Sequence, residues 1–295
     1  MNSFKRLRAV LAATALTVAV IAPAAANNVE TFSDSSRLVA VGGSLTEIVY
    51  ALGEEKRLIA RDSTSMFPPE SEALPDVGYM RALSPEGLMS VDPSAILMLE
   101  GSGPPEALEV LRKASVEMVT VPETFDRAGI LAKIEAVGRA LGTEEKADQL
   151  AEKVGADIDA AEKAVAAVTE RKRVLFILSM QGGRILASGH GTAADGIIAM
   201  AGGVNAVDGY EGYKPLTDEA VQAARPDVVL MMDRVGDHSA ANDALFSHAA
   251  MVGTPAAQNH AVVRMDGAYL LGFGPRTASA IRDLAHALYG DAVSD

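Results

Sequence analysis

One stretch of the sequence occurs twice, and this repeat constrains the fold more than any other feature. Residues 83–98 read LSPEGLMSVDPSAILM and residues 216–231 read LTDEAVQAARPDVVLM. In each copy an N-cap residue, Ser84 or Thr217, begins a short helix, and a proline then leads into an apolar strand. A Gly-Tyr pair precedes each copy. The repeat predicts two similar lobes, each with a tyrosine loop and a helix that carries a glutamate in its first turn. The matched positions are Leu83/Leu216, Glu86/Glu219, Pro93/Pro226, Leu97/Leu230 and Met98/Met231, and the pairs are Gly78-Tyr79 and Gly212-Tyr213.

The amino terminus has the composition of a secretory signal. Basic residues stand among the first eight positions, residues 9–22 are dominated by apolar side chains, and residues 24–26 are small alanines typical of a cleavage site. The apolar run is too short to span a bilayer comfortably. We therefore expect residues 1–26 to be a cleaved signal peptide and the mature protein to be exported to the periplasm.

Cysteine content and charge exclude several classes of function. The sequence has no cysteine, which excludes a lipid-modified cysteine anchor, disulfide bonds and zinc–thiolate sites. The formal net charge of −13 argues against nucleic acid as a partner, because phosphate backbones are bound by basic surfaces. Basic residues that gather at one site would stand out against this background.

Strands that alternate with helices predict an α/β fold in which each lobe is a mostly parallel sheet with flanking helices. The Gly42-Gly43 turn is expected to lead into a helix that Ser44 caps, with Glu47 completing a capping box. The strands expected in the two lobes are residues 37–41, 57–61, 95–99 and 116–121, then 173–178, 184–187, 227–232 and 260–265.

The middle of the chain is almost wholly helical from residue 126 to about residue 168, with one interruption at residues 141–143. The second helical piece is too long for a crossover within one lobe, so we predict a rigid helix that bridges the lobes. The resulting division is a signal peptide (1–26), a disordered lead-in (27–36), an N-terminal lobe (37–142), a bridging helix (143–170) and a C-terminal lobe (171–295).

Two loop residues are candidate ligands. Tyr79 lies in a glycine loop with Arg81 two residues later, and a phenolate can coordinate ferric iron. The alternative is a half-buried surface tyrosine. His190 lies between two glycines, just after a predicted strand, where an imidazole could approach a ligand; the alternative is a histidine in solvent. The remaining histidines show no spacing typical of metal ligands.

Loops at the carboxyl ends of the predicted strands are expected to face one another across a cleft between the lobes. Charged residues near this cleft allow two interpretations. Arg234 and Arg276 follow strands of the second lobe and could reach the cleft, although such residues are more often solvated. Glu86 and Glu219 could simply complement the dipoles of their helices. Their matched positions also fit a pseudo-twofold docking surface. The sequence has no nucleophile elbow, HExxH motif or P-loop, so catalysis has little positive support.

Several stretches of the sequence together resemble the periplasmic haem-binding proteins of haemin ABC importers. These proteins belong to a class that also carries cobalamin and ferric siderophores. The resemblance covers nearly the whole mature chain. It is carried by VGGSLTEIVYALG (41–53), LPDVGYMRALSPEG (74–87), EGSGPP (100–105), RVLFILSMQGGR (173–184), GTAADGIIAMAGGVNAVDGYEGYKPL (191–216) and MDGAYLLGFGPR (265–276).

The resemblance implies roles for particular residues. Tyr79 would be the axial ligand of haem iron, Arg81 would contact that tyrosine or a haem propionate, and Arg234 would contact the tyrosine from the second lobe. His190 would ligate a second haem in members that hold two. Glu86 and Glu219 would dock onto the membrane subunits of the importer, which a cytoplasmic ATPase drives indirectly. An outer-membrane haem uptake system would act upstream.

The sequence therefore predicts a non-enzymatic periplasmic protein that captures ferric haem b between two lobes and delivers it to an ABC importer for iron acquisition. A ferric siderophore or cobalamin carrier on the same scaffold is the alternative, and it would leave Tyr79 without an iron-ligating role. A periplasmic metal-dependent enzyme that uses His190, Asp195 and Tyr79 is a further alternative, which would require turnover and a metal bound without porphyrin.

Overall fold

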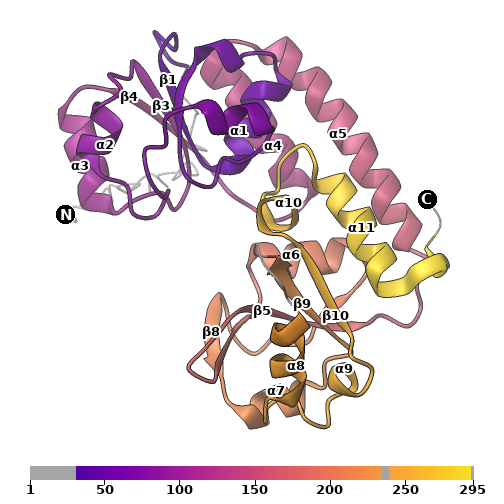
Figure 1. Cartoon of the computed structure of the whole chain (residues 1–295). Coiled ribbons are helices and arrows are strands. Elements are labelled where there is room, and N and C mark those ends of the chain that lie inside the picture. Colours follow the sequence, from indigo (N-terminus) through magenta and orange to yellow (C-terminus); the bar gives the residue numbers. More distant parts are fainter. Residues whose placement is uncertain (1–30, 234–238, 294–295) are drawn as a thin grey trace, which may run out of the picture.

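The chain forms two α/β lobes, with helices running along one side of both (Figure 1). The computed structural model describes residues 31–233 and 239–293. The expected signal peptide, residues 27–30 and Arg234 therefore lie outside the described residues. The predicted fold class of two sheet-containing lobes joined by a long helix is confirmed.

The first lobe is built on a four-stranded, wholly parallel sheet in the order β2-β1-β3-β4. The two central strands are buried along their whole length, which explains their uninterrupted apolar sequences. The elements are β1 (Leu38–Val41), α1 (Gly43–Ala51), β2 (Leu58–Arg61), α2 (Pro85–Met89), β3 (Ala95–Leu99), α3 (Pro105–Lys113) and β4 (Glu117–Val121), with 3₁₀ turns at Glu55–Arg57 and Pro69–Ala73.

The turn between β1 and α1 differs from the prediction. Gly42, not Ser44, precedes the first helical residue, and its φ of 121° is accessible to glycine but strained for other residues. A side chain at Gly42 would also collide with Leu99, whose Cδ1 would lie 2.6 Å from the added Cβ. The predicted capping box of Ser44 and Glu47 is therefore wrong. Both residues lie inside the helix and are buried.

The residues just before β1 also differ from the prediction. Of the expected disordered lead-in, residues 31–36 pack onto the first lobe. Phe32 is buried, and its N–H donates to the carbonyl of Ala140. The Ser33 N–H donates to Glu117, and the Ser35 hydroxyl accepts from Arg57. The polar composition of this segment suggested disorder, but Phe32 anchors it in the core and the side chains of Glu117 and Arg57 bind it.

Two antiparallel helices form the side of the molecule. α4 (Arg127–Leu141) begins at Asp126, whose carboxylate accepts from the Gly129 N–H, and ends at the left-handed residue Gly142. α5 (Glu144–Val165) has 22 residues and is about 33 Å long at 1.5 Å per residue. It packs against α4 along its length and also against the last helix of the chain, α11 (Thr277–Tyr289).

The second lobe holds a sheet in the order β10-β9-β5-β6-β8, with β7 also paired to β5. β7, β9 and β10 run parallel to β5, whereas β6 is antiparallel to both of its neighbours, β5 and β8. The elements are β5 (Arg173–Gln181), β6 (Arg184–Ser188), α6 (Ala193–Met200), β7 (Val204–Asn205), β8 (Tyr213–Leu216), α7 (Asp218–Ala224), β9 (Val228–Asp233), α8 (Ser239–Ser247), α9 (Pro255–Gln258), β10 (Val262–Asp266), α10 (Gly267–Leu271) and α11, followed by a 3₁₀ turn at Gly290–Ala292.

The sequence repeat corresponds to a repeated unit of structure. The Ser84 hydroxyl caps α2 by accepting from the Gly87 N–H, and the Thr217 hydroxyl caps α7 by accepting from the Ala220 N–H. Each short helix leads into a parallel strand, β3 or β9, as predicted.

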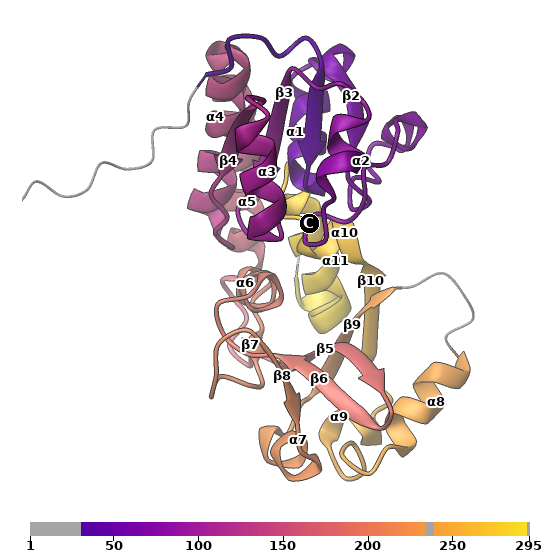
Figure 2. The same ribbon diagram turned by 90° about the vertical axis from the view of Figure 1, so that its left-hand side faces the viewer.

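One hydrophobic core runs through both lobes. It joins the first sheet, α4, α5, α11 and α6 to one face of the second sheet, where Val174, Phe176 and Leu230 lie. The alternate residues Leu175 and Ile177 face the other way, into a separate cluster under α7, α8 and α9. Figure 2 shows α10 and α11 at the level where the two lobes meet. Within the described ranges, no helix is both long and apolar enough to cross a membrane.

Candidate functional site

The tyrosine loop of the first lobe lies at the carboxyl edge of its sheet. Gly78 has a φ of 101°, and Tyr79 follows it with 44% of its surface exposed. The loop is fastened to the turn after β3, because the Gly103 N–H donates to the Met80 carbonyl and the Leu83 N–H donates to the Gly103 carbonyl. Arg81 Nη1 donates to the Tyr79 phenol oxygen at 3.0 Å. The predicted proximity of Tyr79 and Arg81 is therefore present, with the positive charge beside the phenol oxygen.

The His190 loop of the second lobe is exposed at its tip and held at its backbone. The Gly189 N–H donates to the Gly212 carbonyl, the Gly212 N–H donates to the His190 carbonyl, and the His190 N–H donates to the Tyr210 carbonyl. These bonds join the His190 loop to the segment that carries the second Gly-Tyr pair. Directly after the loop, Thr192 caps α6 by accepting from the Asp195 N–H.

Tyr213 follows the glycine that is bonded to the His190 loop, and the sequence pattern indicated no role for it. It is the first residue of β8, lies opposite Ser188 of β6, and has 37% of its surface exposed. Burial raises the pKa of its phenol, while the Thr192 hydroxyl, the Ala194 N–H and the charge of Arg81 act against that rise. Arg81 belongs to the first lobe, so its charge acts on tyrosines of both lobes. The second Gly-Tyr pair was the sequence signal that could have identified Tyr213.

Asp195, which the enzyme alternative would use as a catalytic or metal-binding group, has structural partners. Its carboxylate accepts from the Gly191 N–H at 3.0 Å and from the Asn205 amide at 3.0 Å. Among the residues that the structure describes, no group of three or more His, Cys, Asp or Glu side chains could hold a metal ion. Asp195 therefore has a structural role, because it binds the backbone of the His190 loop through Gly191.

A buried ion pair connects the lobes. Glu47 of α1 accepts from Arg276 of the second lobe through both carboxylate oxygens, at 3.1 Å and 2.5 Å. The Arg276 guanidinium also stacks on the Phe67 ring of the first lobe, 3.6 Å from its centroid. Burial raises the pKa of Glu47, and Arg276 opposes that rise. Arg276 therefore joins the lobes instead of standing free in solvent.

Lys133 of α4 forms a second connection between the lobes, and its side chain is fully buried. Its ammonium group donates to Ser44, to Glu123 and, in the second lobe, to the Phe273 carbonyl at 3.0 Å. Burial lowers the pKa of Lys133, and Glu123 opposes that change. No sequence pattern indicated a buried role for Lys133, because a lysine on an amphipathic helix is normally solvated.

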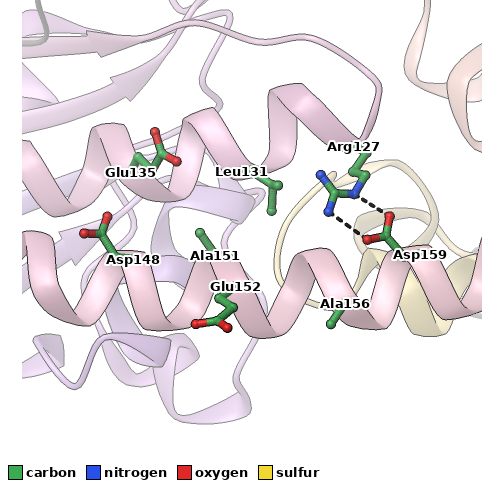
Figure 3. A pocket seen from close by; sticks show the side chains of 8 residues that line it. All are labelled: Arg127, Leu131, Glu135, Asp148, Ala151, Glu152, Ala156 and Asp159. Atoms are coloured by element: carbon green, nitrogen blue, oxygen red, sulfur yellow. Dashed lines mark hydrogen bonds and ion pairs between the residues drawn. The ribbon is translucent and has the colours of Figure 1, made fainter.

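Two cavities lie near or between the lobes. One, of about 450 Å³, lies between the lobes and is lined by Met66, Phe67 and Glu72 of the first lobe and by Asp266, Ala268, Tyr269 and Arg276 of the second. The other, of about 510 Å³, is a groove between α4 and α5 (Figure 3). Its lining carries Glu135, Asp148, Glu152 and Asp159 and one cation, Arg127, which is paired with Asp159. That groove would repel an anionic ligand. Tyr79 and His190 line neither of these two cavities, so the candidate binding site is placed by the two loops and not by a cavity.

Glu86 and Glu219 occupy equivalent, exposed places in the first turns of α2 and α7. The Ser84 hydroxyl donates to Glu86 at 3.1 Å. The Glu219 N–H and the Thr217 hydroxyl lower the pKa of the Glu219 carboxyl. Both carboxylates interact with their own helix starts, and both remain open to a partner.

Comparison with known sequences identifies a family and several relatives. The model of the periplasmic binding protein family matches residues 38–269. An ABC transporter substrate-binding lipoprotein of Bacillus subtilis, YvrC, is 26% identical over 261 residues, which are 88% of this chain and 81% of the relative. A vitamin B12-binding protein of Vibrio cholerae is 24% identical over 252 residues, covering 85% and 88% of the two chains.

Comparison with solved structures gives higher identities. The periplasmic heme-binding protein BhuT, solved with two hemes, is 38% identical, with a TM-score of 0.81 over 88% of this chain and 99% of that chain. The periplasmic heme-binding protein RhuT of Roseiflexus sp. RS-1, in apo form, is 37% identical, with a TM-score of 0.82 over 88% and 100%. The periplasmic heme-binding protein HutB of Vibrio cholerae is 32% identical, with a TM-score of 0.77 over 87% and 100%.

Proposed function

Because the chain belongs to the periplasmic binding protein family, we propose that it binds ferric haem between its lobes and delivers it to an inner-membrane ABC importer. Tyr79 is the proposed axial ligand of the iron. Arg81 is the proposed contact of that tyrosine or of a haem propionate, and the periplasm is the proposed location.

The pairing of Tyr79 with Arg81 is the observation that carries this proposal. An exposed phenol beside a guanidinium suits ferric iron, because the positive charge stabilises the oxygen anion that coordinates the metal. Haem is a flat apolar plate with two anionic edges. A site with exposed aromatic side chains and a cation at its rim matches those properties, and the space between the lobes offers both.

The comparisons support haem over the related ligands. The solved heme-binding proteins are 32–38% identical to this chain over 87–88% of its length. The vitamin B12-binding relative in Vibrio cholerae is 24% identical. Cobalamin remains the second candidate, because its carriers match most of the chain.

The number of bound haems depends on the second lobe. BhuT was solved with two hemes. His190, exposed at the tip of a loop whose backbone is fixed, is the proposed ligand of a second haem. Replacing it by alanine should lower the haem-to-protein ratio from two to one. A ratio that stays the same in the variant would remove His190 from this role.

Delivery is proposed to use the matched glutamates. Glu86 and Glu219 would contact membrane subunits of the importer, whose cytoplasmic ATPase acts indirectly. An outer-membrane haem uptake system would supply the ligand. The two glutamates are exposed and lie in different lobes, as contacts with a two-fold partner would require.

An absorbance titration of the purified mature protein with ferric haem tests the proposal. The wild type should saturate with a high-spin, tyrosinate-type spectrum, and Tyr79→Phe should lose that spectrum and bind far more weakly. Tyr50→Phe is a matched control, since Tyr50 lies in the last turn of α1. Saturable binding of cobalamin, with no spectral change on adding haem, would favour the second candidate instead.

A further inference from the structure

Tyr213 occupies the position in the second lobe that Tyr79 occupies in the first. Gly78 and Gly212, with φ values of 101° and 80°, place a tyrosine directly after a left-handed turn in both lobes. Each tyrosine is followed within a few residues by the N-cap of a short helix, Ser84 or Thr217. A glycine with positive φ therefore precedes a tyrosine in each lobe, although Tyr79 lies in a loop and Tyr213 begins β8.

The structure holds Tyr213 firmly in place. Its strand, β8, pairs with β6 over four residues, from Tyr213 opposite Ser188 to Leu216 opposite Ile185. The Tyr213 ring meets Phe176 edge-on, with the ring centroids 6.3 Å apart. The glycine before it is bonded to the His190 loop. A ring fixed in this way loses little conformational entropy when a ligand covers it.

The neighbours of Tyr213 connect it to the first lobe. α6, whose first turn lies beside Tyr213, packs against the loop after β4, because a Cβ on Gly196 would come within 2.2 Å of the Phe125 carbonyl oxygen. Arg81, which donates to the Tyr79 oxygen, is near enough for its charge to act on Tyr213. The guanidinium of Arg81 is therefore bonded to Tyr79 and also acts electrostatically on Tyr213, in the other lobe.

We propose that Tyr213 is the contact of the second lobe with the bound macrocycle, a neutral phenol whose ring forms an aromatic wall rather than an iron ligand. This inference rests on the proposed haem-binding function and adds a residue to it. An axial ligand must give up its proton, whereas burial raises the pKa of Tyr213. A flat, aromatic, largely apolar ligand is the class that such a wall would recognise.

Iron-free protoporphyrin IX separates contact with the ring system from contact with the metal. Tyr213→Ala should weaken the binding of both ferric haem and protoporphyrin IX by about tenfold, the size of an aromatic contact. Tyr213→Phe should bind both nearly as well as the wild type. The tyrosinate spectrum of the haem complex should persist in both variants. Tyr79→Phe should weaken haem binding but leave protoporphyrin IX binding nearly unchanged.

The control variant is Val252→Ala, which shortens another exposed apolar side chain of the second lobe and should change neither affinity. Unchanged affinities in Tyr213→Ala would overturn the inference while leaving the haem proposal intact. Loss of the tyrosinate spectrum in Tyr213→Phe would also overturn it, because Tyr213 would then be a metal ligand. Failure of the wild type to bind haem would instead refute the proposed function itself.

A measurement on the wild-type chain avoids any dependence on the folding of variants. Nitration of tyrosines by tetranitromethane, followed by peptide mass spectrometry, should modify Tyr213 in the free protein and spare it when haem or protoporphyrin IX is bound. Tyr50, in the last turn of α1, should react equally in both states. Equal nitration of Tyr213 with and without ligand would contradict the contact.

Discussion

Lys133 lies on a helix of the first lobe, yet its ammonium group donates to the Phe273 carbonyl of the second lobe at 3.0 Å. It also binds Ser44 and Glu123, and its side chain has no exposed surface. A buried charge of this kind is tolerated only where several partners replace water. Removal of the lysine would leave those partners unsatisfied on both sides of the junction.

Lys133→Met should therefore lower the free energy of unfolding by about 3 kcal/mol, the usual cost of breaking a buried ion pair. Urea unfolding at pH 7 measures this change. Lys113→Met is the control, because Lys113 is exposed in the last turn of α3 and its replacement should cost less than about 0.5 kcal/mol. If Lys133→Met lowered the free energy of unfolding as little as Lys113→Met, the buried amine would contribute little to stability.

The same variant has a predicted pH dependence. Burial lowers the pKa of Lys133 in the folded protein, whereas a free lysine titrates near about 10.4. Between these two pKa values the unfolded chain binds more protons, so the contribution of Lys133 to stability rises with pH. The difference in unfolding free energy between wild type and Lys133→Met should therefore be larger at about pH 10, close to the pKa of a free lysine, than at pH 7. A difference that shrinks with pH would contradict the assigned direction.

Residue-level roles were predictable only where the partner is close in sequence. Ser84 and Thr217 were predicted as N-caps because the bonded N–H lies three residues away. Arg81 was placed beside Tyr79 for the same reason. Glu47 was assigned to a capping box, but its partner, Arg276, lies 229 positions later. A sequence alone does not indicate which distant charge a glutamate will meet.

Among the elements, the strands and long helices were the most predictable. β3 and the break at Gly142 agree with the sequence pattern, because apolar runs and a glycine C-cap are local signals. The short strands β7 and β8 and the short helices α9 and α10 carry weaker patterns and were not predicted. Their geometry depends on what covers the sheet, so the sequence did not specify it.

The contact between α4 and α5 depends on Gly138. A Cβ at this position would lie 2.2 Å from the Cβ of Ala147, so only a glycine lets the helices approach this closely. Gly138→Ala should lower the free energy of unfolding by about 2 kcal/mol, because overpacking outweighs the gain in helix propensity. The midpoint of urea unfolding, at constant m-value, measures the effect.

Gly155→Ala is the matched control for this prediction. Gly155 lies on α5, and an added Cβ would meet the flexible end of Arg127 at 3.0 Å, a contact that the arginine can relax by moving. The variant should stay within about 1 kcal/mol of the wild type. If both alanine variants were equally stable, the close approach at Gly138 would not limit the packing.

At the scale of the whole molecule, the repeat places an exposed glutamate in the first turn of a short helix in each lobe, Glu86 in α2 and Glu219 in α7. Glu86→Gln combined with Glu219→Gln removes both proposed docking charges while keeping the side-chain shape. Haem binding should be unchanged, but haem uptake into vesicles that hold the importer should fall by more than tenfold. Loss of paired charges at a docking interface typically costs several kcal/mol.

The control for that experiment is Glu144→Gln combined with Glu145→Gln. These residues carry the same charges in the first turn of α5, also in exposed positions. Normal haem uptake with both the control and the docking variant would contradict the docking role. Glu86 and Glu219 would then serve only to complement the dipoles of their helices. Reduced uptake by both would point to overall charge rather than to a specific surface.

The shared core also affects the order in which the protein can be made. The apolar faces of α4 and α5 are completed by α11, which contains residues 277–289 of a 295-residue chain. A chain that emerges from the ribosome amino terminus first has almost all of its length exposed before the helix that seals it is available. The first lobe therefore cannot complete this shared core until residues 277–289 are available.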